Sequence, residues 1–166
     1  MKTRKLCILA LLSAAALAIF VAEAQIPPVV AIPGVKLGLS NIIVLLTMYL
    51  YGRREALAVL AVKLILGSVF AGQLMSFFYS AAGGICCWSI MSLLKGVLSE
   101  KQLWATSAFG AVAHNAAQLA VAVCLLGTDK LLWYAPVLLA SGIITGVFTG
   151  LGATLALPGL HRVLKL

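Results

Sequence analysis

The chain has 166 residues, of which 63% are hydrophobic and only 10% are charged. A soluble domain carries about 25% charged residues, so this chain has too few polar side chains to be a soluble, disordered or disulfide-scaffold protein. The net charge of +8 comes from basic residues that gather at the ends of apolar segments, as the positive-inside rule produces in membrane proteins. We therefore expect an all-α membrane protein that binds no nucleic acid.

The first apolar segment is predicted to form a helix over residues 6–24, after a basic start. Alanines at every fourth position give it one flat face suited to close helix contact; they are Ala10, Ala14, Ala18 and Ala22. We favour a retained helix. The alternative is a secretory signal peptide cleaved before Gln25, because the basic start and the small residues near Ala24 are typical of such signals.

A loop and five further helices are predicted after this segment. Residues 25–34 contain three prolines and cannot continue a helix. The later apolar segments predict helices over residues 36–51, 55–71, 74–94, 103–126 and 131–157. Pro158 and Gly159 are expected to end the last of them.

The predicted fold class is a six-transmembrane-helix bundle, with residues 1–166 forming a single transmembrane domain. A bilayer crossing needs roughly 20 apolar residues, and the predicted segments approach or exceed that length. Most of the 12 Lys and Arg residues then fall on the side of the membrane that holds both termini. This asymmetry predicts a multi-pass cell-membrane protein with both termini in the cytoplasm.

The last predicted helix carries small residues on one stripe at helical spacing. Gly142, Gly146 and Gly150 form two overlapping GxxxG patterns within it. Such patterns let two helix backbones approach closely. We interpret the stripe as a helix-packing surface and not as a catalytic feature.

Lys63 is the ionisable residue placed deepest in the predicted membrane region. It lies nine residues after Arg54, which corresponds to about 13 Å along a helix at ~1.5 Å per residue. No acidic residue lies near it in the sequence, so we expect an anionic ligand, a hydrated cavity or hydrogen bonds within the bundle. If it faces a substrate cavity, Lys63→Met should leave the fold as stable or more stable.

Polar residues also interrupt two other predicted helices. His114 and Gln118 are one turn apart in the fifth helix and Asn115 lies on the adjoining edge, so the three form a stripe that either lines a ligand pocket or joins helices. Near the start of the second helix, Lys36 and the exposed amides of a helix N-terminus favour an anion. Asn41 would add a polar group below them. A pair between Lys36 and Glu23 is the alternative for this site.

The sequence offers little for catalysis. It lacks phosphate-binding Walker sequences, GxSxG and HExxH, and its single aspartate cannot supply the Asp-rich motifs that hold magnesium diphosphate in prenyl-transfer enzymes. The four cysteines have no metal-ligand spacing. We expect no catalytic residues, no metal site and no cofactor.

Two motifs carry a family resemblance. The run from Ile32 to Asn41, followed by the run from Tyr49 to Arg53, resembles the signature of a bacterial family labelled Gx transporter or heptaprenyl diphosphate synthase component I. The run from His114 to Gln118 is similar to its fifth-helix motif, and the resemblance covers about residues 6–157. This family is similar to the substrate-binding S components of energy-coupling-factor (ECF) transporters. The resemblance implies that Ala10, Ala14, Ala18 and Ala22 dock onto a transmembrane coupling subunit.

The resemblance leads to two predicted functions. The first is a non-enzymatic S-component-like membrane subunit that captures a small or prenylated, anionic molecule with Lys36, Asn41, Lys63, His114, Asn115 and Gln118. Uptake would then require a transmembrane coupling subunit and two ATPase subunits. The alternative is a non-catalytic membrane component associated with a heptaprenyl diphosphate synthase, or with a flavoprotein in a quinone-linked extracellular electron-transfer system.

Overall fold

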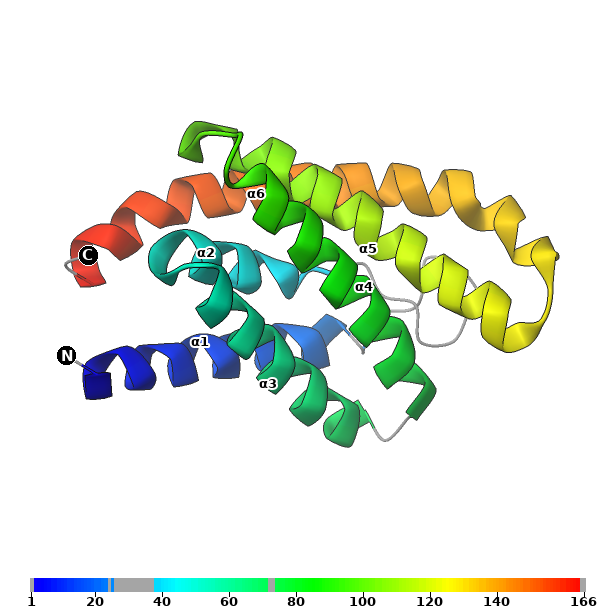
Figure 1. Ribbon diagram of the computed structural model, residues 1–166, viewed down its shortest axis with the longest axis horizontal. Helices are drawn as coiled ribbons and strands as arrows, with labels where there is room; N and C mark the ends of the chain where they lie inside the picture. The colour runs from blue at the N-terminus through cyan, green and yellow to red at the C-terminus, as the bar shows by residue number, and fades with distance from the viewer. Residues whose placement is uncertain (1, 24, 26–37, 72–73, 165–166) are drawn as a thin grey trace.

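The structure is a computed structural model that describes residues 2–23, 25, 38–71 and 74–164 (Figure 1). Within these ranges it has six α-helices: α1 (Lys2–Glu23), α2 (Asn41–Tyr51), α3 (Arg53–Ala71), α4 (Leu74–Leu94), α5 (Leu103–Leu126) and α6 (Ala135–Leu164). Two 3-10 helices, η1 (Glu100–Gln102) and η2 (Asp129–Tyr134), precede α5 and α6. The described residues form no strand, which confirms the predicted all-α class.

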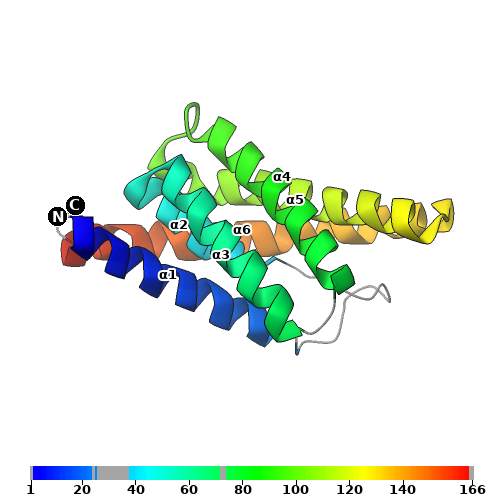
Figure 2. The same ribbon diagram turned by 60° about the horizontal axis from the view of Figure 1, so that its bottom comes forward.

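The helices form one elongated bundle around the short helix α2. The start of α1 and the end of α6 lie together at one end, here named the terminal end, and Arg4 Nη2 donates to the Leu164 carbonyl there at 2.9 Å (Figures 1 and 2). Helices α5 and α6 form an antiparallel hairpin, α4 packs on α5, and α1 packs on α3. The α5–α6 turn projects furthest from the terminal end in both views and is named the hairpin end.

Among the described residues, four segments are long and apolar enough to cross a membrane, as expected of a membrane protein. They are Thr3–Glu23, Phe77–Leu94, Glu100–Leu126 and Asp129–Leu164. Helix α2 is apolar but has only 11 residues, about 16 Å at ~1.5 Å per residue. Helix α3 carries Arg53, Arg54, Glu55 and Lys63 and is outside this set.

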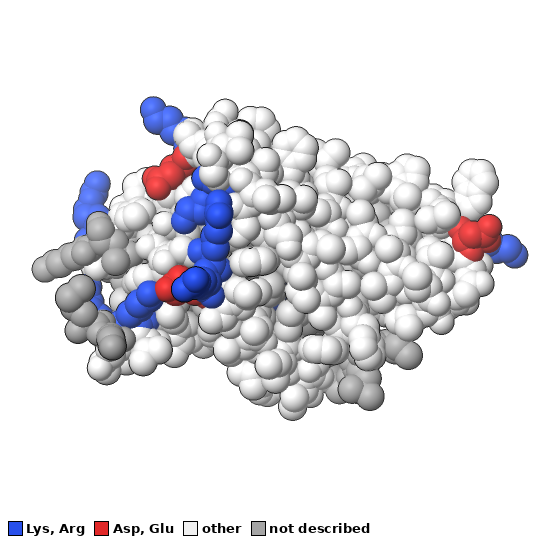
Figure 3. Space-filling view, viewed as in Figure 1, with Lys and Arg blue, Asp and Glu red and all other residues white. Residues whose placement is uncertain are grey.

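Charged side chains are scarce along the sides of the bundle. On the face drawn in Figure 3, basic and acidic side chains gather toward the terminal end, a small group marks the hairpin end, and the surface between them is uncharged. At the terminal end, Lys5 Nζ lies 2.5 Å from Glu55 Oε1. Lys95 Nζ donates to the Met48 carbonyl, and burial together with the nearby Arg53 charge lowers the pKa of Lys95.

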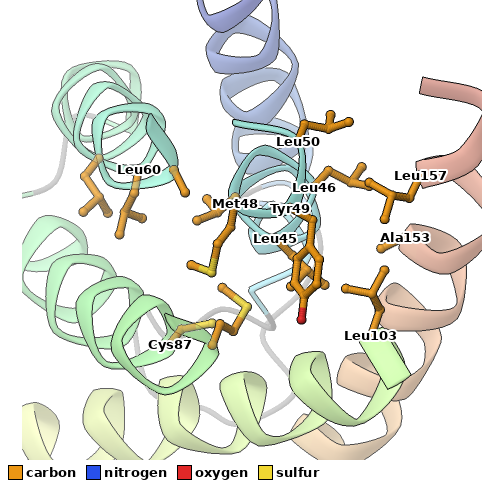
Figure 4. Packing of buried hydrophobic residues seen from close by; sticks show 14 residues of the cluster. Leu45, Leu46, Met48, Tyr49, Leu50, Leu60, Cys87, Leu103, Ala153 and Leu157 are labelled. Atoms are coloured by element: carbon orange, nitrogen blue, oxygen red, sulfur yellow. The ribbon is translucent and has the colours of Figure 1, made fainter. Parts of the chain in front are cut away.

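The main hydrophobic core surrounds α2. Leu45 and Met48 of α2 are fully buried, and they pack with Leu60 of α3, Cys87 of α4 and Leu157 of α6 (Figure 4). Side chains from these three helices thus pack against one short helix. Packing from all sides explains why an 11-residue helix, too short to be stable alone, is ordered here.

The predicted glycine stripe forms the α5–α6 contact. A Cβ added to Gly146 would lie 2.6 Å from the Ala108 Cα, and one added to Gly150 would lie 2.4 Å from the Trp104 Cα. Gly142 faces the Asn115 side chain in the same way. Only glycine permits this backbone approach, so the helix-packing interpretation of the stripe is confirmed.

Several predicted helix boundaries differ from those in the structure. Helix α1 begins at Lys2 and not at residue 6, and α2 begins at Asn41 and not at residue 36, because residues 38–40 form a turn with Gly38 at φ +79°. The last α-helix begins at Ala135, after η2, and continues past Pro158 to Leu164. Pro158 removes one backbone donor, but the buried Leu157 and the packed Leu160 and Leu164 hold the last turns against the core.

Candidate functional site

The bundle encloses a group of polar side chains near its middle. We name this group the polar cluster; its members are Glu23 of α1, Asn41 of α2, Lys63 of α3, and His114 and Gln118 of α5. All five are buried, with exposed fractions between 0% and 8%. His114 lies eleven residues into α5, about 16 Å from its start at ~1.5 Å per residue. The cluster therefore lies at a depth where polar groups normally serve a function or stabilise the bundle.

Lys63 donates hydrogen bonds to the turn before α2 and to its first residue. Its Nζ lies 3.1 Å from Ser40 Oγ and 2.8 Å from Asn41 Oδ1. It also lies 6.0 Å from the centre of the Phe20 ring, within the range of a cation–π contact. The sequence analysis gave hydrogen bonds within the bundle as one alternative for Lys63. The structure shows that these bonds are present.

Asn41 connects Lys63 to His114. Its Nδ2 lies 3.2 Å from His114 Nδ1. The Lys63 ammonium group only donates hydrogen bonds, so the atom of Asn41 that it contacts is the acceptor Oδ1, and Nδ2 is the group that faces the ring. In the tautomer in which His114 Nδ1 accepts from this amide, the ring proton is on Nε2.

Glu23 enters the cluster through a backbone contact that the sequence did not reveal. The Gly38 N–H donates to Glu23 Oε1. A Cβ at Gly38 would approach His114 Nε2 to 3.2 Å and Asn41 Nδ2 to 3.0 Å, and the φ of +79° also disfavours other residues. Glycine at 38 thus lets the backbone pass beside the histidine while it binds the carboxylate.

Helix α4 approaches the other side of the histidine at Gly83. A Cβ on Gly83 would lie 2.8 Å from two atoms of the His114 ring and 3.0 Å from Gln118 Cγ. The adjacent Gly84 faces Leu60 of α3 in a similar way. Sequence reasoning missed Gly83, although paired glycines inside an apolar helix were an available signal of close backbone approach.

Several buried polar atoms near His114 have no hydrogen-bond partner. Within the described part of the chain these are His114 Nε2, Asn115 Oδ1, Gln118 Nε2, Gln118 Oε1, and Ser80 Oγ on α4, three residues before Gly83. A buried polar group without a partner costs about 1–3 kcal/mol. These atoms do not join helices to one another, so they remain able to bond to a ligand or to water.

Asn115 is directed elsewhere. Its Nδ2 donates to the Leu138 carbonyl of α6 at 2.7 Å, and Ser141 Oγ donates to the same carbonyl at 2.9 Å. The side chain therefore joins α5 to α6 next to Gly142. Of the three polar residues expected to act together on α5, the structure groups His114 with Gln118 and places the amide nitrogen of Asn115 in a helix–helix contact.

Two further sets of predicted residues lie apart from the cluster. Lys36 is outside the described residues. The alanines of α1 all lie on its exposed face, opposite the side that carries the buried Ser13, Ala16 and Phe20; they are Ala10, Ala14, Ala18 and Ala22. In the described structure these four alanines are thus exposed on one face of α1.

A small cavity lies beside Asn41, between α4, α5 and α6. Its volume is about 10 Å³, enough for about one water molecule. Its lining includes Ser107 and Thr149, whose hydroxyl oxygens lie 3.0 Å apart. In the described ranges, no three His, Cys, Asp or Glu side chains are grouped as a metal site.

Comparison with known proteins gives one match. A family model described as heptaprenyl diphosphate synthase component I matches residues 12–156, which confirms the family recognised from the motifs at Ile32–Asn41 and His114–Gln118. No curated protein and no solved structure matches the chain significantly.

Proposed function

Because the chain belongs to the heptaprenyl diphosphate synthase component I family, we propose that it is a non-catalytic integral membrane subunit that binds a small or prenylated molecule at the polar cluster. The observation that carries the proposal is the set of buried atoms at His114 and Gln118 that have no partner among the described residues. A buried polar atom without a hydrogen-bond partner costs about 1–3 kcal/mol. A ligand that bonds to these atoms offsets this cost, which favours binding.

The contrast with Asn115 strengthens the proposal. A polar side chain that joins membrane helices bonds to a partner on another helix, as Asn115 does with the Leu138 carbonyl. Gln118 is as deeply buried but contacts no such partner among the described residues. Helix joining therefore accounts for the amide nitrogen of Asn115, although its Oδ1 has no partner among the described residues. It accounts for neither polar atom of Gln118, whereas ligand binding accounts for both.

The proposed orientation places both termini in the cytoplasm, with all six helices embedded in the cell membrane. It is supported by basic residues at the terminal end, among them Arg4, Lys5, Arg53 and Lys95, because cytoplasmic segments are enriched in Lys and Arg. In a variant without native cysteines, Lys130→Cys in η2 should react with an impermeant reagent in intact cells. Lys101→Cys in η1 should react only after lysis, and the reverse pattern would contradict this orientation.

The proposed partners follow from the exposed alanine face of α1. A flat face of small residues suits close packing against another membrane helix, and we assign it to a transmembrane coupling subunit that works with two ATPase subunits, as in ECF transporters. The chain would then deliver its ligand through that assembly.

The family description supports a second function, a non-catalytic membrane component that associates with a prenyl diphosphate synthase. We keep beside it the alternative of a membrane component that associates with a flavoprotein of a quinone-linked electron-transfer system. Affinity purification of the tagged chain from detergent-solubilised membranes, with partners identified by mass spectrometry, separates the two. Recovery of ATPases with a coupling subunit supports the transport assembly. Recovery of a prenyl synthase or flavoprotein without ATPases contradicts it and supports the second function.

A further inference from the structure

We infer that the cavity beside Asn41 binds a single water molecule, which bonds to the hydroxyl groups of Ser107 and Thr145 and so joins the polar cluster to α6. The cavity has a volume of about 10 Å³, enough for about one water molecule, and such a water needs roughly two to four polar partners. This site is distinct from the unpartnered atoms of His114 and Gln118, so the inference does not depend on the proposed function.

The hydroxyl groups that line the cavity present acceptors to it. Thr149 Oγ1 donates its only proton to the Thr145 carbonyl at 2.8 Å. Ser107 Oγ is therefore the donor in the 3.0 Å contact between the Ser107 and Thr149 hydroxyls. Thr145 Oγ1 likewise donates to the Ser141 carbonyl at 2.8 Å. The hydroxyl oxygens of Ser107 and Thr145 thus keep free lone pairs, and neither accepts a hydrogen bond in the described part of the chain.

A water molecule complements these acceptors because it carries two O–H donors. One O–H bonds to Ser107 of α5 and the other to Thr145 of α6. In return the water accepts from Asn41, whose Nδ2 carries two N–H groups, at most one of which bonds to His114 Nδ1, 3.2 Å away. Asn41 and Ser107 are 8% and 7% exposed, so the water is internal and has three protein partners on three different helices.

The surroundings of the cavity favour a neutral occupant over a cation. Lys63 Nζ lies 2.8 Å from Asn41 Oδ1, so a positive charge lies next to the cavity and the amide oxygen is already engaged. None of the described lining residues is acidic, and two of them, Cys87 and Met91 of α4, offer sulfur. Hard cations such as Na⁺ or Ca²⁺ prefer a shell of oxygen ligands. Water therefore fits this lining and a metal ion does not.

Two methionines of the main core provide a test. Met91 lines the cavity and is 1% exposed, whereas Met48 belongs to the same core, is 0% exposed and does not line the cavity (Figure 4). A brief X-ray exposure splits water into hydroxyl radicals, and these oxidise a methionine that lies beside the split molecule. Oxidation of each methionine is measured by mass spectrometry on the purified full-length chain in detergent. We expect Met91 to be oxidised about 10-fold faster than Met48, because the internal water lies beside Met91 alone.

Variants link the oxidation to the hydroxyl groups. The double variant Ser107→Ala with Thr145→Val removes both acceptors, and an apolar cavity stays dry. Met91 oxidation in this variant should fall to the rate of Met48. Thr154→Val is the matched control: Thr154 Oγ1 donates to the Gly150 carbonyl of α6 at 2.9 Å but does not line the cavity. Its substitution should leave Met91 oxidation unchanged.

Three outcomes would overturn the water site. Equal oxidation rates of Met91 and Met48 in the wild type would show that no water lies in the cavity, and this comparison requires no variant to fold. Fast Met91 oxidation in a folded double variant would show that radicals reach the methionine from outside. Met91 oxidation that is fast in choline chloride and slow in NaCl would show that Na⁺ takes the place of water. None of these results bears on ligand binding at Gln118, which is tested separately by substitution of that residue.

Discussion

Asn41 Nδ2 and His114 Nδ1 lie 3.2 Å apart, although the two residues are separated by 73 positions in the chain. This contact connects the polar groups on α1, α2 and α3 with those on α5. Asn41 also accepts a hydrogen bond from Lys63, so a single amide side chain contacts both the lysine and the histidine. The cluster therefore behaves as one network, and substitutions within it are expected to be non-additive.

Substitution of Lys63 should destabilise the protein. Lys63→Met removes the donor to Ser40 and Asn41 and leaves buried acceptors behind, at a cost of about 1.5–3 kcal/mol. The sequence alone, which does not reveal these contacts, predicts that Lys63→Met is as stable as the wild type or more stable. The structure predicts the opposite, a less stable variant. Thermal unfolding in detergent measures the effect, with Lys130→Met on the exposed surface of η2 as the control. A midpoint equal to that of the wild type would show that the Lys63 hydrogen bonds contribute no stability.

Substitution of two amide side chains on α5 should change the stability of the protein in opposite directions. Gln118→Leu removes buried atoms that lack partners and should raise the stability of the ligand-free protein by about 1–3 kcal/mol. Asn115→Leu breaks the bond to the Leu138 carbonyl and should lower stability by about 0.5–1.5 kcal/mol. The unfolding midpoints of both variants are compared in the same detergent. A loss of stability in Gln118→Leu would contradict the assignment of this side chain to ligand binding.

The α5–α6 contact should tolerate no side chain at Gly150. In Gly150→Ala the added Cβ meets backbone atoms of Trp104 and Leu103, so the helices must separate, and overpacking of this kind costs about 1–3 kcal/mol. Gly152→Ala, on the same helix, meets only the end of the Ile42 side chain at 3.5 Å and should be neutral or slightly stabilising. Equal midpoints for the two variants would mean that the close approach is not essential.

The exposed face of α1 gives a prediction about assembly. Ala14→Leu lies on the exposed side of the helix and should leave the unfolding midpoint unchanged, while it weakens co-purification of membrane partners. Ala16→Leu, two residues away, fills a position that is 0% exposed and should destabilise the bundle itself. If Ala14→Leu keeps its partners, this face is not the docking surface.

Sequence reasoning succeeded where one local property decides the structure. Apolar length predicted α4 over residues 74–94 and α5 over residues 103–126, and both boundaries agree with the structure, because a membrane helix satisfies its own backbone hydrogen bonds whatever its neighbours are. The glycines at 142, 146 and 150 likewise predicted a packed helix face. Helix ends were predicted less accurately. Helix α6 continues past Pro158 because Leu157 and Leu160 pack against the core.

The composition of the candidate site was decided by tertiary structure. The sequence marked Lys63, Asn41, His114 and Gln118 as polar residues in apolar surroundings, but it gave no sign that Asn41 contacts both Lys63 and His114 or that Asn115 faces α6. Nor did it place Glu23 beside Gly38. Hydrogen bonds between residues far apart in the chain depend on how the helices are rotated and packed, and that is fixed only when all of them are in place. The sequence therefore determined which residues are costly to bury, and the tertiary structure decided which of them have partners and which remain able to bind a ligand.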